Sequence, residues 1–142
     1  MAAKDLLHES FKRALLRDKW TITHDPLVLK IGRRNALVAL GAQKLLAAER
    51  GPDKIAVEIK TFAGPSPMSE LEKAWGQFFL YAKVLRKRNP ERSLYLAVSE
   101  TIFETLFEEE AGQLLLTEPG FRIIIFDEKL EEITQWHPPI NP

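Results

Sequence analysis

The spacing of hydrophobic residues changes along the first third of the chain, from a helical to an extended period. Apolar residues recur every three or four positions over residues 4–19, which predicts an amphipathic helix. Short apolar runs at 20–23 and 27–31 then predict two strands. We expect a turn between them at His24-Asp25-Pro26, because Asp-Pro favours the start of a turn.

The next segment predicts a turn, an apolar run and a hairpin. Gly32-Arg33-Arg34 is typical of a turn and precedes the apolar run Ala36–Leu40. Strands are expected at 44–48 and 54–62, joined by Arg50-Gly51-Pro52-Asp53. The first of these strands is rich in Ala and Leu, which are also strong helix formers. The Gly-Pro turn lies where a hairpin needs it, and it favours the strand.

The clearest amphipathic helix follows the loop Ala63–Pro67. Ser69 and Glu72 have the spacing of a capping box, in which both side chains satisfy backbone N–H groups at a helix start. Asn89-Pro90 marks the end of the helix. The apolar stripe expected to face the core consists of Leu71, Ala74, Trp75, Phe78, Ala82 and Leu85.

The remaining chain alternates apolar strands with one helix. Leu94–Val98 and Phe121–Phe126 are continuous apolar runs that predict buried strands, and Ser99 is expected to cap a helix reaching about Phe107. Ile133–Trp136 predicts an edge strand before an exposed tail, His137-Pro138-Pro139. This order of elements predicts an α/β fold, in which a mixed sheet carries helices on both faces.

Composition limits the classes of function. A chain of 142 residues is expected to form one domain, residues 1–142. Its 20 basic and 20 acidic side chains balance, so no overall field draws it to nucleic acid or to an anionic membrane. The absence of cysteine excludes disulfides and Cys-based zinc sites. Without a signal-like apolar N-terminus or a stretch of about 20 apolar residues, we expect a cytoplasmic, soluble protein with no membrane contact.

Candidate chemistry begins with the strand around residues 55–60. Ile55, Val57 and Ile59 alternate into a core, so Glu58 and Lys60 share the opposite face. A carboxylate beside an ammonium is able to hold a divalent metal and to steady the charge of a phosphate. The alternative is a solvated strand face with a simple ion pair.

The second helix contributes two further polar groups. Gln77 and Tyr81 are four residues apart and therefore lie on one side of the helix, at the border of its apolar stripe. They are candidates to contact a phosphate or to orient Lys60, or they are simple boundary residues. A basic patch at the helix end is a candidate contact for a DNA backbone or a complement to the helix dipole. It consists of Lys83, Arg86, Lys87, Arg88 and Arg92.

Taken together, these stretches are more specific than any one of them. They are Ala3-Lys4-Asp5 with His8, Trp20–Pro26, Leu40-Gly41-Ala42, Ala47-Ala48-Glu49, Ile55–Phe62, Gly76-Gln77 with Tyr81, and Leu94–Val98. On these residues the chain resembles the XisH proteins, named for a factor that controls excision of a DNA element, the fdxN element, in nitrogen-fixing cyanobacteria. The likeness extends from near residue 3 to near Trp136.

The resemblance implies a place in the PD-(D/E)xK nuclease superfamily. The fold of that superfamily is restriction-endonuclease-like, with a central mixed β-sheet flanked by helices. The resemblance gives Glu58 the role of the metal-binding acid and Lys60 that of the catalytic lysine. It matches Gln77 and Tyr81 to the Gln-x-x-x-Tyr helix of some nuclease branches.

One departure from the XisH pattern weakens the implied metal site. XisH-like chains usually read Asp-Leu-Gly-Ala-Glu where this chain reads Ala39-Leu40-Gly41-Ala42-Gln43. Either acid is a candidate for the upstream metal ligand, and both are neutral here. Magnesium is normally held by one or two carboxylates plus substrate phosphates, so we expect Mg²⁺ to bind weakly or not at all. Glu9 of the first helix is an alternative second ligand.

These observations leave three hypotheses for the function. The first is an accessory or controlling factor in programmed DNA excision, with a degenerate nuclease site that binds DNA or a partner protein. The resemblance implies a XisI-like partner, and we expect a homo-oligomer. The second is an active Mg²⁺-dependent DNA endonuclease that uses Glu58 and Lys60. The third is an oligomeric protein-interaction module with a vestigial cleft.

Overall fold

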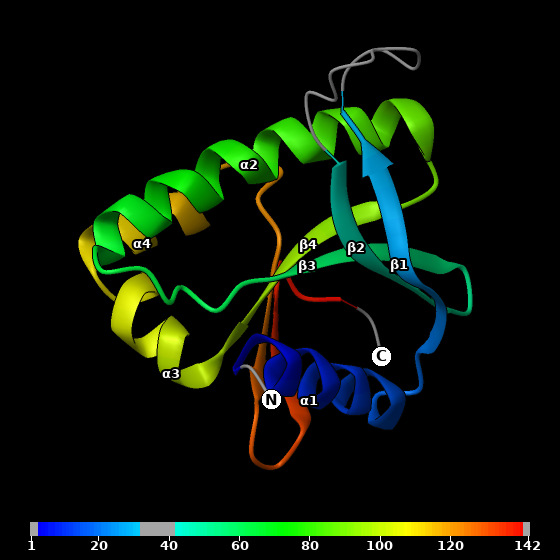
Figure 1. Ribbon diagram of the computed structural model, residues 1–142, viewed down its shortest axis with the longest axis horizontal. Coiled ribbons are helices and arrows are strands. Elements are labelled where there is room, and N and C mark those ends of the chain that lie inside the picture. The colour runs from blue at the N-terminus through cyan, green and yellow to red at the C-terminus, as the bar shows by residue number, and fades with distance from the viewer. Residues whose placement is uncertain (1–2, 32–41, 141–142) are drawn as a thin grey trace.

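Within residues 3–31 and 42–140, which the computed structural model describes, six strands form one mixed sheet with helices on both faces (Figure 1). The strands follow one another across the sheet in chain order. They are β1 (Thr21–Lys30), β2 (Ala42–Arg50), β3 (Asp53–Ile59), β4 (Ser93–Ser99), β5 (Ile123–Asp127) and β6 (Glu132–His137). The helices are α1 (Ala3–Arg17), α2 (Pro67–Arg88), α3 (Glu100–Ile102), the π-helix η1 (Phe103–Phe107) and α4 (Glu110–Leu116).

The centre of the sheet is parallel and its flanks are antiparallel. β3, β4 and β5 run parallel, whereas β1 and β2 on one side and β6 on the other pair antiparallel to their neighbours. Parallel neighbours need a crossover connection. The first crossover is α2, and α3, η1 and α4 supply the second. The predicted mixed sheet with helices on both faces is therefore confirmed.

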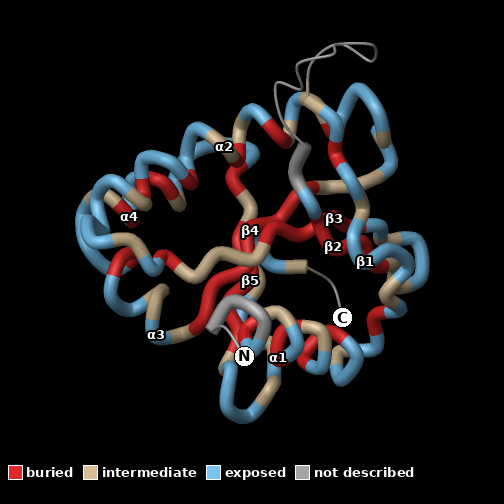
Figure 2. The backbone as a smooth tube through the Cα atoms, in the orientation of Figure 1, coloured by how far each residue is buried: buried red, intermediate tan, exposed pale blue. Residues whose placement is uncertain are grey.

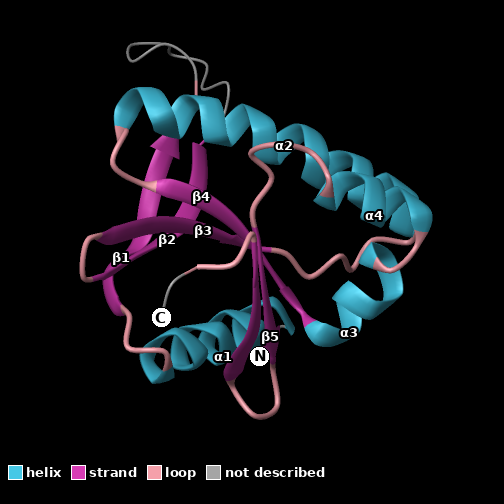
Figure 3. Ribbon diagram, turned by 180° about the vertical axis from the view of Figure 1, so that it is seen from behind, coloured by secondary structure: helices cyan, strands magenta, loops and turns pink. Residues whose placement is uncertain are grey.

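Alternate side chains of β3 enter two different cores. Ile55 and Val57 pack with Phe11 beneath α1, whereas Ala56 packs with Phe78 beneath α2. Figure 2 shows the buried strands between the two helical layers, and Figure 3 shows the same layers from behind. Burying each such large apolar side chain stabilises the fold by roughly 1.5–3 kcal/mol. The same alternation turns the next even-numbered side chain, Glu58, towards α2.

The predicted turn at His24-Asp25-Pro26 is wrong, because β1 continues through these residues. The pairing of β1 with β2 shifts register between Ile22 and His24 and again between His24 and Leu27. Bulges of this kind absorb extra residues without ending the strand. The predicted strand 54–62 ends earlier, at Ile59. The predicted turn at 32–34 and the apolar run Ala36–Leu40 lie outside the described residues.

The long helix begins earlier than the capping box predicted. Ser66 is its N-cap and accepts a 3.3 Å hydrogen bond from the Ser69 backbone N–H, and Pro67 is the first helical residue. Proline suits this position because its missing N–H has no partner there anyway. Asn89 caps the other end, as predicted. Of the expected stripe, Trp75 is 37% exposed, and Tyr81 is buried in its place.

Two features near the C-terminus differ from the sequence interpretation. The helix α4 was not predicted, and its first turn contains Glu110, where an acid favours the helix dipole. Gly112 lets α4 pack closely on η1, because a Cβ there would lie 2.2 Å from the Leu106 carbonyl oxygen. His137 belongs to β6 rather than to an exposed tail, and its ring bonds the Leu116 carbonyl at 2.9 Å. Among the described residues, no helix is long and apolar enough to span a membrane.

Candidate functional site

Glu58 occupies the end of a central strand and points into the layer beneath α2. β3 is paired on both sides, by β2 and by β4, so it lies in the interior of the sheet. The Glu58 residue is only 5% exposed. Burial of a carboxylate is unfavourable unless charges or hydrogen bonds compensate for the lost water. The surroundings of Glu58 must therefore supply that compensation.

Lys60 follows directly after β3 and lies beside Glu58. Its backbone N–H donates to the Ala97 carbonyl at 3.0 Å, which extends the pairing with β4 by one residue. Its Nζ is 3.7 Å from Glu58 Oε1 and donates to Gln77 Oε1 at 2.8 Å. The Lys60 side chain is 20% exposed, so the ammonium reaches both the buried acid and solvent. The predicted common orientation of Glu58 and Lys60 is confirmed.

Gln77 and Tyr81 come to the same cluster from α2. Gln77 is half-buried, and its amide oxygen holds the Lys60 ammonium. Tyr81, one turn further along, is buried in the core beneath α2. Burial raises the pKa of the Tyr81 phenol, and the negative charge of Glu58 raises that pKa further. We call these four residues, Glu58, Lys60, Gln77 and Tyr81, the strand-end cluster.

The strand-end cluster combines an acid, an ammonium, an amide and a phenol. Such a set suits a phosphate, because ammonium and amide groups bind phosphate oxygens, and a carboxylate is the ligand type that a divalent cation prefers. Among the described residues, no three His, Cys, Asp or Glu side chains are grouped so that they could hold a metal. Ala39 lies outside the described residues, and Gln43 belongs to β2 without a described side chain.

Glu9 is not a second ligand beside Glu58, which corrects that alternative. It is part of α1, which packs on the opposite face of the sheet from α2. Its carboxylate lies 3.8 Å from the Lys12 ammonium in the same helix. The packing of α1 against the other core therefore separates Glu9 from the strand-end cluster.

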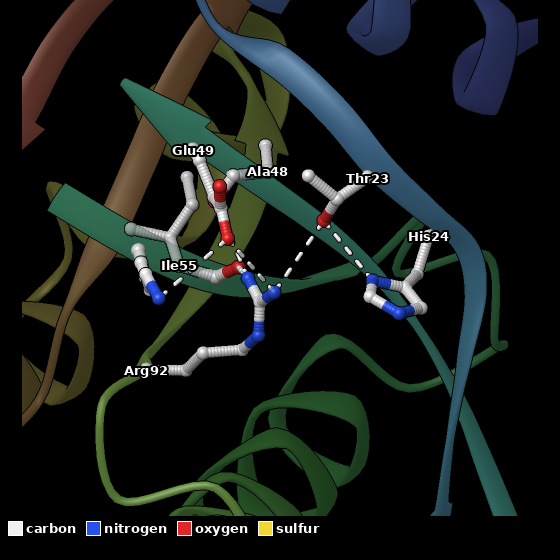
Figure 4. Close-up of polar contacts among 7 residues, drawn as sticks. Thr23, His24, Ala48, Glu49, Ile55 and Arg92 are labelled. Atoms are coloured by element: carbon white, nitrogen blue, oxygen red, sulfur yellow. Dashed lines mark hydrogen bonds and ion pairs between the residues drawn. The ribbon is translucent and has the colours of Figure 1, made fainter. Parts of the chain in front are cut away.

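The basic patch predicted at the end of α2 divides into two parts. Arg92 has a 6% exposed side chain and donates to the Ile55 carbonyl at 3.1 Å and the Ala48 carbonyl at 3.4 Å (Figure 4). It also contacts Glu49 and Thr23 at 3.4 Å each. Arg92 is thus a structural cation that joins β1, β2 and β3. The exposed part of the patch is Lys83, Arg86, Lys87 and Arg88.

The structure also brings together a polar cluster around Asp25 that the sequence did not predict. Asp25 of β1 bonds His8 Nε2 at 2.9 Å and Lys12 Nζ at 2.8 Å. Burial raises the pKa of Asp25, but Lys12 and His8 outweigh it, so the net pKa lies below the ordinary value. The Asp25 hydrogen bond also raises the pKa of Lys12 against the lowering effect of burial. The four-residue spacing of His8 and Lys12 was the only local signal.

The fold and the strand-end cluster define an α/β protein in which a helix-covered mixed sheet holds a buried acid beside a lysine. The family model of the XisH protein matches residues 1–134, and the chain belongs to the XisH family.

Two solved structures are similar over almost their whole length. One is an XisH family protein from Nostoc punctiforme PCC 73102, with 41% identity, a TM-score of 0.82, and coverage of 94% of this chain and 99% of that chain. The other is a fdxN element excision controlling factor protein from Anabaena variabilis, with 40% identity, a TM-score of 0.81, and coverage of 94% and 98%. No curated protein matches the chain.

Proposed function

We propose that this chain is an accessory factor that controls the excision of a DNA element. The proposal is supported by its XisH family membership and by its 40% identity to a fdxN element excision controlling factor protein. A shared fold does not by itself transfer a function, so the argument must rest on the site. We further propose that the chain acts in the cytoplasm as a homo-oligomer, with DNA and a XisI-like protein as partners.

The strand-end cluster is the observation that carries the proposal. Glu58, Lys60, Gln77 and Tyr81 have the residue types of a PD-(D/E)xK nuclease site, and the Lys60 ammonium lies between Glu58 and Gln77. We propose that the core is restriction-endonuclease-like and that its site binds phosphate without efficient cleavage. The reason is the neutral pair Ala39 and Gln43, because a single carboxylate holds Mg²⁺ weakly when no substrate phosphate is bound.

The second candidate function is an active Mg²⁺-dependent DNA endonuclease. The bond between Lys60 and Gln77 favours it, because a lysine fixed beside a metal-binding acid is positioned to stabilise charge on a phosphate. In this candidate, metal held at Glu58 would activate water for attack on a phosphodiester. The third hypothesis, an interaction module with a vestigial cleft, predicts that no change in the cluster alters metal or DNA binding.

Metal titration separates the candidates. We expect the unmodified chain to bind Mg²⁺ no tighter than the millimolar range, about 4 kcal/mol of binding free energy, in calorimetry. The variant carrying Ala39→Asp and Gln43→Glu should bind more tightly because it adds carboxylates to the site. Lys60→Ala in that background should leave metal binding nearly unchanged and abolish any rescued DNA cleavage, since an ammonium does not ligate a metal. Micromolar binding that Glu58→Gln abolishes would favour the endonuclease.

Excision in cells tests the proposed role itself. Deleting the gene in its host and amplifying across the excision junction should show excision lost or deregulated, and the unmodified chain should restore the control. Glu58→Gln should restore it too, because a degenerate site needs no metal-dependent step. Control that requires Glu58 together with DNA cleavage by the unmodified chain contradicts the accessory role. Excision that is unaffected by the deletion contradicts any role in excision.

A further inference from the structure

The long helix α2 exposes several cations that no acid neutralises. Lys73, Lys83, Arg86 and Lys87 are exposed, and none of them has an ion-pair partner among the described residues. The cations of α1 whose side chains are described differ, because they pair with acids elsewhere in the fold: Lys12 with Asp25, Arg13 with Glu131 and Arg17 with Glu132. Other exposed lysines without an ion-pair partner among the described residues are scattered singly, at Lys19, Lys30, Lys44 and Lys129, whereas α2 carries four such cations on one helix.

Three of these cations, Lys73, Lys83 and Lys87, follow one line along the helix. Lys73, Gly76, Leu80, Lys83 and Lys87 are spaced three, four, three and four residues apart, and all five are exposed. Residues at this spacing lie on one face of a helix. We call this set the α2 stripe. The buried face of α2, which includes Phe78 and Tyr81, lies on the opposite side of the helix, so the stripe points away from the sheet and from the strand-end cluster.

The helix dipole does not account for the whole stripe. Cations in the last turn of a helix complement the dipole, and this explains the three basic residues Arg86, Lys87 and Arg88. The effect falls off within that last turn. Lys73 and Lys83 lie outside it and find no acid partner among the residues described. The acids of α2, Glu70 and Glu72, are both near its beginning.

Gly76 is a second observation that points to a partner on this face of α2. Glycine is the poorest helix former after proline, and here it stands in the interior of a 22-residue helix. A Cβ built at Gly76 meets nothing within 4 Å, so no contact within the described residues requires glycine. A residue without a side chain lets a partner approach the helix backbone closely. Its position in the middle of the α2 stripe marks where such a partner would approach.

The dimensions of the stripe suit a phosphate row. Lys73 and Lys87 are 14 positions apart in the sequence, which corresponds to about 21 Å of helix at 1.5 Å per residue. One strand of B-DNA carries a phosphate every 3.4 Å along the axis, so about six phosphates span that length. An apolar partner helix would instead favour a continuous apolar stripe, and of the five residues only Leu80 is a large apolar side chain.

We infer that the α2 stripe is the contact surface for the sugar–phosphate backbone of a DNA duplex, with Gly76 as the point of closest approach. The inference rests on the proposed function, and it adds the position of the DNA on the surface of the protein. The DNA backbone follows the exposed face of α2, on the side of the helix away from the sheet. Lys73, Lys83 and Lys87 supply the phosphate contacts.

Salt-dependent binding of a fluorescent 30-base-pair duplex, followed by anisotropy, tests the surface. The variant Lys83→Gln with Lys87→Gln should lower the slope of log affinity against log salt by about 2 and weaken binding roughly 10- to 100-fold near 0.1 M salt. A matched control is Lys19→Gln with Lys129→Gln, which removes the same charge from exposed lysines away from α2. The control should bind within about twofold of the unmodified chain, because it leaves every phosphate contact in place.

Gly76→Gln tests the close approach without changing any charge. Its side chain should raise the midpoint of thermal unfolding, because glutamine is a better helix former than glycine. It should weaken duplex binding on the order of tenfold, because the added side chain holds the duplex backbone away from the neighbouring lysines. Higher stability together with weaker binding distinguishes a contact point from damage to the fold.

Three results of the binding experiments overturn the inference. The first is an equal loss of duplex affinity in the lysine variant and in its control. The second is an unchanged duplex affinity of Gly76→Gln. The third is binding of polyglutamate as tightly as the duplex. The excision assay reports on the proposed function separately. If the unmodified chain and the lysine variant restore excision control equally, the function stands and the surface assignment fails. If neither does, although duplex binding depends on the stripe, the surface stands and the function fails.

Discussion

The two helical layers differ in whether their exposed cations have acid partners within the fold. On one face of the sheet, the cations of α1 form ion pairs with acids of the strands and their turns. On the other face, α2 covers the strand-end cluster and exposes cations without acid partners among the residues described. The first arrangement uses charge to hold the fold together. The second leaves charge available for a partner, which is why we place the DNA there.

The α1 layer also connects both edges of the sheet. Lys12 reaches Asp25 of β1 and Arg17 reaches Glu132 of β6, and these are the two outer strands. The rings of Trp20 and Trp136 approach to 5.4 Å on the same side. Sheets twist, and this one brings its edges together beneath α1. Substitutions in the α1 layer should therefore affect stability, and those in the α2 layer should affect binding.

Removing a structural cation is the largest expected change. Arg92→Ala leaves the carbonyls of Ile55 and Ala48 without this donor and should lower the free energy of unfolding by about 3 kcal/mol in urea titration. Arg86→Ala, at an exposed position near the end of α2, is the control and should change stability by less than about 0.5 kcal/mol. Equal effects of the two changes would remove the distinction between structural and available cations.

Local patterns in the sequence were sufficient to predict the strand-end cluster. Strand alternation placed Glu58 and Lys60 on one side, and helical spacing placed Gln77 and Tyr81 together. Both periods follow from backbone geometry and need no knowledge of distant residues. The order of strands and helices was readable for the same reason. The catalytic and metal-binding roles assigned to the four residues stay predictions, because geometry alone does not test them.

Contacts between distant segments were not predictable in this way. The bonds of Arg92 to Ile55 and Ala48, and that of Asp25 to His8, depend on strand register, which residue spacing does not encode. The start of α2 was misread because Ser66 and Ser69 both suit an N-cap, and Pro67 selects the first. The turn expected at Asp25-Pro26 failed because bulges in β1 accommodate it within the strand.

Asp25→Asn tests the ion pairs of the α1 layer by the pH dependence of stability. Its expected effect on the free energy of unfolding is the second largest. The folded pKa of Asp25 lies below the ordinary 3.8, so its ion pairs stabilise the fold above that pH and this contribution is lost as pH falls through the folded pKa. Near neutral pH, Asp25→Asn should therefore lower the free energy of unfolding by about 1 kcal/mol. The difference from the unmodified chain should shrink in acid. A difference that persists well below pH 3.8 would mean that packing, not charge, is lost.

The smallest expected effect is also the most direct comparison of the two layers. Arg13→Gln with Arg17→Gln removes two exposed cations that have acid partners, whereas Lys83→Gln with Lys87→Gln removes two exposed cations that have none among the described residues. Exposed ion pairs contribute roughly 0.2–1 kcal/mol each, and both arginine side chains are more than half exposed, so the arginine variant should lose only about 0.5–1 kcal/mol of unfolding free energy.

The lysine variant should lose less than about 0.5 kcal/mol, because no intramolecular partner is left behind. Both variants carry the same net charge, so any difference between them in urea titration comes from where the charges lie. Duplex affinity should show the reverse order, with the lysine variant the weaker binder, because phosphate contacts depend on the cations that face the DNA. The same order in both measurements would mean that net charge, rather than the division between the layers, governs binding.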